Sequence, residues 1–136
     1  MNQQELTFQC YGCRMTLHMP TAMEQMSISK IRQFFKFFNQ EYWRNEESTR
    51  LFFSQIPDVL ASLKEKWDTA SRNFINDYQD PEFDSGGNYI SDKMERQKRR
   101  DHNKRLMSKV KSAKAACTRF EKRIPKLKEL QELYQH

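Results

Sequence analysis

Two different periodicities divide the chain near residue 20. Before that point, apolar side chains alternate with polar ones on both sides of a short turn segment. This period of two is typical of half-buried strands, so residues 1–20 are predicted to form a β-hairpin with Gly12 in its turn. The alternating positions are Leu6, Phe8, Cys10, Met15, Leu17 and Met19.

After residue 20, apolar positions recur every three or four residues, as in amphipathic helices. The first pattern predicts one helix over about 21–43, opened by a capping box of Thr21 and Glu24. A second helix is expected to start near Ser54 and Pro57, which are suited to a cap and to a first turn. The apolar positions of the two helices are Ile28, Ile31, Phe35, Phe38 and Tyr42, then Ile56, Leu60, Leu63, Trp67, Ala70 and Phe74.

The segment 79–91 contains two of the three glycines and a proline, and it predicts a loop. A last helix is expected from Ser91, with an apolar seam that only Gln131 interrupts. Pro125 lies within that helix and is expected to kink or restart it near residue 124. The seam positions are Leu106, Val110, Ala113, Cys117, Phe120, Ile124, Leu127 and Tyr134.

These patterns predict a mainly α protein. The expected architecture is an antiparallel helical bundle or coiled-coil hairpin, preceded by a short N-terminal β-hairpin that forms a zinc knuckle if it binds metal. The expected domains are a Cys-containing hairpin over 1–20 and a helical bundle over 21–136, which includes a basic helical arm over about 91–114. In this bundle the helix ending near Tyr78 packs against the one starting near Ser91, with Trp67 and Phe120 in the core.

Charge is distributed unevenly along the chain, which has a formal net charge of +6. Residues 1–90 contain nine Lys or Arg and twelve Asp or Glu, whereas residues 91–136 contain fifteen and six. Such asymmetry bears on partners rather than on fold, and it favours nucleic acid, an anionic membrane surface or an acidic protein.

The basic arm carries the main functional prediction. Its side chains are spread around more than one helical face, which suits neutralisation of phosphates better than reading of base edges. We therefore expect a non-enzymatic nucleic-acid-binding accessory or regulatory protein. The candidate binding residues are Lys93, Arg96, Lys98, Arg99, Arg100, Lys104, Arg105, Lys109, Lys111 and Lys114.

A second class of function fits the same size and charge. The helical seam and exposed aromatic rings are also typical of a protein-interaction module, or of a small inhibitor of phage or mobile-element type that acts on a nucleic-acid-processing enzyme. The FFKFF run, residues 34–38, suits a helix core with one or two rings left for a partner. A homodimer through the helical seams is a further expectation. A solvated basic helix without a partner is the plain alternative to both classes.

The two N-terminal cysteines raise the question of a metal. Cys10 and Cys13 flank the hairpin turn, where two thiolates can converge on zinc. His18 and Cys117 are the candidates for further ligands, and a second chain is another source. The C-x2-C-x4-H spacing resembles the first three ligands of a retroviral-type zinc knuckle, but the fourth position falls on Met23. The alternative is two reduced thiols in a hairpin turn.

The remaining expectations concern location and chemistry. The N-terminus lacks the charged and apolar regions of a secretory signal, and the sequence has no run of eighteen apolar residues. Three cysteines are a poor basis for a disulfide framework. We therefore expect a cytoplasmic protein without a membrane partner. The sequence shows no catalytic constellation, so no enzymatic activity is expected.

Overall fold

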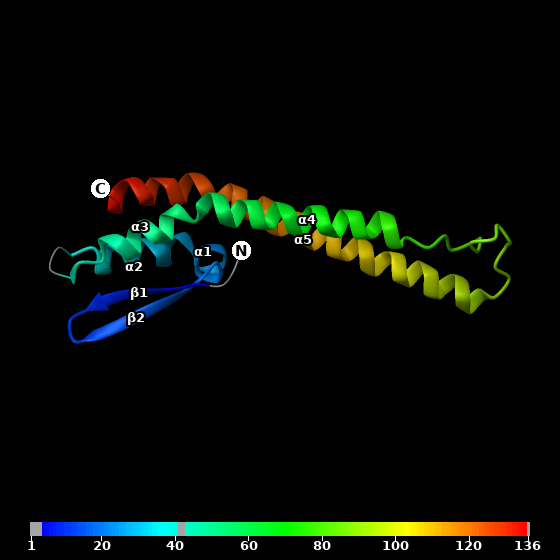
Figure 1. Cartoon of the computed structure of the whole chain (residues 1–136), viewed down its shortest axis with the longest axis horizontal. Coiled ribbons are helices and arrows are strands. Elements are labelled where there is room, and N and C mark those ends of the chain that lie inside the picture. The colour runs from blue at the N-terminus through cyan, green and yellow to red at the C-terminus, as the bar shows by residue number, and fades with distance from the viewer. Residues whose placement is uncertain (1–3, 41–42, 136) are drawn as a thin grey trace. The chain divides into compact units, whose positions relative to one another are not determined.

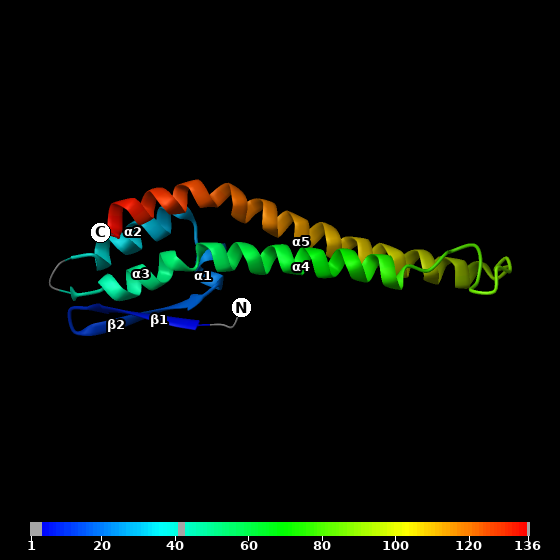
Figure 2. The same ribbon diagram turned by 45° about the horizontal axis from the view of Figure 1, so that its top comes forward.

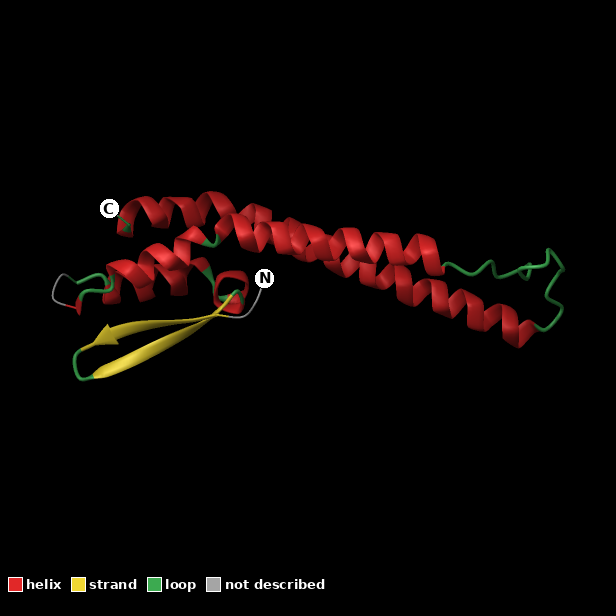
Figure 3. Cartoon of the chain, viewed as in Figure 1, coloured by secondary structure: helices red, strands yellow, loops and turns green. Residues whose placement is uncertain are grey.

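The computed structural model describes residues 4–40 and 43–135, and it is mainly helical with a two-stranded N-terminal hairpin (Figures 1 and 3). Both features confirm the prediction of fold class at this level. The elements are β1 (Gln4–Cys10), β2 (Cys13–Met19), α1 (Thr21–Gln25), α2 (Ile28–Phe38), α3 (Glu46–Ser54), α4 (Ile56–Asp77) and α5 (Lys93–Tyr134). They form two compact units, of which unit 1 comprises 1–62 and 119–136, and unit 2 comprises 63–118.

The hairpin forms at the predicted place. β1 and β2 are antiparallel, and their register runs unbroken from Gln4 opposite Met19 to Cys10 opposite Cys13. Gly12 has a φ of 72°, a left-handed value that a side chain at this turn position would strain. The residue type at the turn therefore fixes the register of both strands.

The Phe8 ring is the aromatic contact between the hairpin and the helices of unit 1. Phe8 is fully buried, and its ring centroid lies 4.8 Å from that of Phe34 and 5.7 Å from that of Phe35. Phe35 in turn contacts Phe52 and Phe53 of α3, with centroid distances of 4.9 and 5.0 Å. The FFKFF run is therefore mostly core, and Phe37 is its one exposed ring, at 50%. A two-stranded hairpin is marginal alone, and this aromatic cluster supplies the apolar cover it needs.

The prediction of one helix over 21–43 was wrong. The chain breaks after Gln25 and restarts at Ile28, because Ser27 is an N-cap whose Oγ accepts a hydrogen bond from Lys30 N at 3.1 Å. The capping box at Thr21 was also wrong, since the N-cap of α1 is Pro20 and no side chain caps it. Tyr42 lies outside the described residues.

The segment before α4 is a helix of its own, α3, which the periodicity did not predict. Ser54 ends α3, and its Oγ donates to Leu51 O, so Ser54 does not cap the next helix as expected. Buried Phe52 and Phe53 explain why this segment is helical despite its polar start, because packing outweighs the weak propensity of a nine-residue helix.

Within unit 2, the α4 and α5 segments run antiparallel and side by side, joined by the loop 78–92 (Figures 1 and 2). Trp67 is only half-buried there, which corrects its expected place in the core, and Lys114 Nζ lies 5.7 Å from the ring centroid. Phe120, in unit 1, is 2% exposed, as predicted.

The C-terminal part of α5 departs from the expected seam after Leu127. Leu127 and Leu130 are fully buried, whereas Gln131 is not, so the seam takes a step of three where a step of four was expected. Pro125 is exposed inside α5, which continues through it, so the helix does not restart there, and the alternative expectation of a kink stays a prediction.

Candidate nucleic-acid interface

The ten candidate basic residues lie in the first half of α5, in unit 2. Eight of them are exposed, and among the described residues none of these eight forms an ion pair. The eight are Lys93, Lys98, Arg100, Lys104, Arg105, Lys109, Lys111 and Lys114. Their charge is therefore available to an external anion.

Helical geometry sorts most of these side chains into two rows. Lys93, Arg100, Lys104 and Lys111 recur at spacings of seven, four and seven, so they share one face and form what we call the long basic row. At 1.5 Å per residue this row spans about 27 Å. Lys98, Arg105 and Lys109 form the short basic row on another face. The seam that contains Leu106 and Val110 separates the two rows on the side toward α4.

Arg96 and Arg99 are held by the protein itself. Arg96 Nη1 donates to Tyr89 Oη and to Ile90 O, both at 2.8 Å, and its guanidinium carbon lies 5.3 Å from the Tyr89 ring centroid. Arg99 Nε donates to Glu95 Oε1 at 3.2 Å, and Arg99 Nη1 donates to Asp80 O at 3.3 Å. These two residues fix the loop to α5, so they are poorer candidates for phosphate contacts than the eight exposed ones.

Polar side chains of α5 also close the end of α4. Asn103 accepts from Gln79 N at 2.9 Å and donates to Gln79 O at 2.7 Å, and His102 Nε2 lies 2.8 Å from Asp77 O. The last carbonyls of a helix lack partners within that helix, and His102 lies against one of them, Asp77 O, whereas Gln79 follows two residues after the helix ends. The segment before Leu106 therefore packs through hydrogen bonds where an apolar seam is missing.

The loop 78–92 is an ordered tip with a different chemistry. Phe83 and Tyr89 pair in an isolated β-bridge, and Asp84 Oδ1 accepts hydrogen bonds from Gly86 N and Asn88 N. Residues 73–92 contain five Asp or Glu and no Lys or Arg. Large apolar side chains of and beside this loop are exposed, namely Ile75, Tyr78, Phe83, Tyr89 and Met94. The sequence predicted a loop here, but sequence reasoning missed the exposed aromatic rings that it presents.

The four candidate zinc ligands are dispersed. Cys10 and Cys13 face each other across the turn and form a disulfide. His18 pairs with Glu5 near the other end of the hairpin, with its Nδ1 3.6 Å from Glu5 Oε1. Cys117 is buried on α5 in unit 2. In the part of the chain that the structure describes, no three His, Cys, Asp or Glu side chains gather as a metal site.

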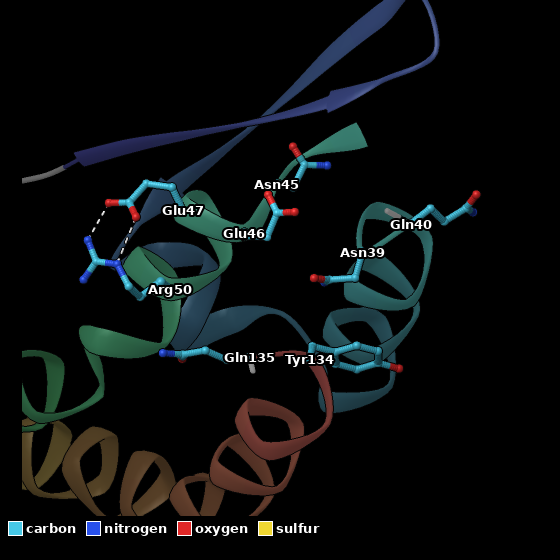
Figure 4. A pocket seen from close by; sticks show the side chains of 8 residues that line it. All are labelled: Asn39, Gln40, Asn45, Glu46, Glu47, Arg50, Tyr134 and Gln135. Carbon is cyan, nitrogen blue, oxygen red and sulfur yellow. Dashed lines mark hydrogen bonds and ion pairs between the residues drawn. The ribbon is translucent and has the colours of Figure 1, made fainter. Parts of the chain in front are cut away.

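Unit 1 contains a polar pocket of about 300 Å³, formed by the α2–α3 connection, α3 and the end of α5 (Figure 4). Glu47 and Arg50 pair on its wall, and the Arg50 hydrogen bonds lower the pKa of the Glu47 carboxyl. The lining combines carboxylates, side-chain amides, one guanidinium and one phenol. The lining residues are Asn39, Gln40, Asn45, Glu46, Glu47, Arg50, Tyr134 and Gln135.

Two residues that position the elements of unit 1 were also missed. Asn45 is 5% exposed, and its side-chain amide bonds to both backbone groups of Gln9 and to Phe38 O. Arg123 Nη2 donates to Met23 O and Met26 O at the end of α1. Gln9 lies 36 residues from Asn45, and Met23 lies 100 residues from Arg123, so no local sequence signal identifies these two contacts.

Comparison of the chain with known proteins identifies no relative. No protein-family model, no curated protein and no solved structure matches the chain. In the described residues, no helix is both long and apolar enough to cross a bilayer.

Proposed function

We propose that this protein is a non-enzymatic nucleic-acid-binding accessory or regulatory protein that contacts phosphate backbones through the basic face of α5. The observation that carries the proposal is the set of eight exposed Lys and Arg side chains without ion-pair partners in the described chain. The long basic row is the surface we assign to the phosphates, because it has four charges along about 27 Å of one face.

The proposed binding depends on the charge of the phosphates and not on the base sequence. Lys and Arg displace counterions from phosphates, and that release makes affinity depend steeply on salt. Phosphate contacts carry no base information, so different duplexes of equal length should bind alike.

Charge-neutral variants of the two rows test the assignment. Changing Lys93, Arg100, Lys104 and Lys111 to Gln should reduce the slope of log K against log salt by about 3.6, at about 0.9 per phosphate on B-DNA. The matched control changes the short basic row, Lys98, Arg105 and Lys109, to Gln. That control should leave the slope within about one unit of the wild-type value. An equal loss in both variants would contradict the assignment to the long row.

A protein-interaction module or small inhibitor acting on a nucleic-acid-processing enzyme is the second candidate. The exposed aromatic rings of the tip support it, since aromatic residues are enriched in the centres of protein interfaces. The five carboxylates nearby favour a partner surface with Lys or Arg. Nucleic-acid affinity at low salt discriminates between the two candidates, because only the first requires it.

A further inference from the structure

The two edges of the N-terminal hairpin differ in their hydrogen bonding. On β1, Gln9 N donates to Asn45 Oδ1 at 2.8 Å, and Gln9 O accepts from Asn45 Nδ2 at 2.9 Å. Thr7 O accepts from Ser48 Oγ at 2.6 Å. The outer edge of β1 is therefore covered by residues at the start of α3, and β1 lies between β2 and that helix in the view of Figure 1.

The register then fixes which backbone groups of β2 point outward. In an antiparallel pair, residues alternate between those bonded to the partner strand and those bonded away from it. Thr7 and Gln9 bond away from β2, so their cross-strand partners Thr16 and Arg14 direct their own N–H and C=O groups away from β1. By the same alternation, the N–H and C=O groups of His18 also point away from β1. No hydrogen bond from the described part of the chain reaches these outward groups.

This open edge has one of the features that usually protect such an edge, the charged side chain of Arg14, and lacks the others. β2 has seven residues in unbroken register, without Pro, Lys or a bulge within it. Met15 adds apolar surface, because it is 52% exposed although Phe8, its cross-strand neighbour, is fully buried. A second strand beside β2 would satisfy the free backbone groups and cover Met15.

We propose that the occupant is β2 of a second copy of this chain, paired antiparallel in a four-stranded sheet about a two-fold axis at Thr16. This arrangement is self-complementary, as a two-fold interface requires. It places Thr16 opposite Thr16 of the partner subunit, and Met15 opposite Leu17 of the partner subunit. Arg14 then lies opposite His18 of the partner subunit.

Charge complementarity between Arg14 and the carboxylate of Glu5 of the partner subunit favours this register and this partner. His18 already faces the Glu5 carboxylate, with 3.6 Å between Nδ1 and Oε1, so each Arg14 would join a row that contains an acidic group. An axis at Arg14 would instead set two arginines directly opposite each other, which is destabilising. The surface is separate from the basic rows of α5, so the inference does not depend on the proposed nucleic-acid function.

Sedimentation of the full chain over a range of concentrations tests the proposal with two variants and a control. Thr16→Lys sets two lysines opposite each other and should weaken dimerisation by up to about fivefold. Thr16→Pro removes the central N–H donor and should abolish the dimer, while a solvent-facing edge position tolerates Pro in the monomer. Thr7→Lys places the same charge on the same face of the covered strand and should dimerise like the wild type.

Amide hydrogen exchange provides an internal readout of the same interface. The amides of Arg14, Thr16 and His18 should become protected as concentration rises, whereas those of Met15 and Leu17, which face β1, should be protected throughout. A wild-type chain that stays monomeric would overturn the proposal. So would a dimer that both Thr16 variants leave intact, because the contact would then lie on another surface such as the helical seam.

Discussion

A few polar side chains hold the elements of unit 1 in place by bonding to distant backbone groups. Asn45 binds β1 to the end of α2, and Arg123 binds α5 to the last carbonyls of α1. Burial lowers the pKa of the Arg123 guanidinium from its usual value, and its hydrogen bonds offset part of that desolvation. A cation at a helix C-terminus also interacts favourably with the helix dipole.

Replacement of Arg123 by Met should therefore destabilise unit 1. The change keeps most of the apolar stem but leaves the carbonyls of Met23 and Met26 without their charged donor. We expect a loss of about 1.5 to 3 kcal/mol in the free energy of unfolding, measured by urea denaturation. Arg119→Met, at an exposed position of the same helix, is the control and should change stability by less than about 0.5 kcal/mol. Equal losses in both variants would mean that the helix-end contact is not the cause.

Zinc binding at Cys10 and Cys13 remains a prediction, and the reduced chain is the form that tests it, because zinc binds thiolates. If Cys10 and Cys13 hold zinc, elemental analysis of reduced, tag-free protein should detect about one equivalent per chain, and Cys10→Ser should remove it and loosen the hairpin. The helices should persist in that variant, because their own apolar faces stabilise them. Less than about a tenth of an equivalent in the wild type would leave the pair as two thiols that form a disulfide, since structural zinc binds tightly.

At the scale of the elements, the sequence predicted correctly those features that neighbouring residues determine. The hairpin was predicted because alternation and a turn glycine are contained within residues 4–19. The break within the predicted helix over 21–43 was missed, because one cap at Ser27 outweighs a continuous apolar spacing. The basic face of α5 was readable because charge requires no tertiary information. The contacts of Arg96 and Arg99 with the loop could not be predicted from the sequence, since they depend on where the loop folds back onto α5.

The contact between α4 and α5 in unit 2 should control how often the end of α4 and the tip open. Asn103→Ala removes both hydrogen bonds to Gln79, so the end of α4 and the tip should open more often. We expect amide exchange across residues 77–92 to rise by about tenfold, which corresponds to about 1.4 kcal/mol of local stability. Ser108→Ala, at an exposed position on α5, should leave exchange unchanged. Unchanged exchange in Asn103→Ala would show that other contacts hold the tip.

At the scale of the whole chain, function is proposed to divide between chemically distinct surfaces. The basic rows of α5 carry the positive charge, the tip is acidic and aromatic, and the hairpin edge offers unpaired backbone groups. In the proposed two-fold pairing about Thr16, the two Cys10–Cys13 turns lie at opposite ends of the joined strands. That dimer would therefore not unite four cysteines around one zinc ion, and the two predictions are independent.

The affinity of the wild-type chain for random-sequence duplex DNA, measured over a range of salt concentrations, tests the central claim most directly. Four engaged side chains predict that log K falls linearly with log salt, with a slope near −3.6 at about 0.9 per phosphate, and that different sequences bind equally. Structured RNA should show a similar dependence if it is the natural ligand. Absence of binding to either nucleic acid at low salt would contradict the account and leave the protein-interaction module in its place.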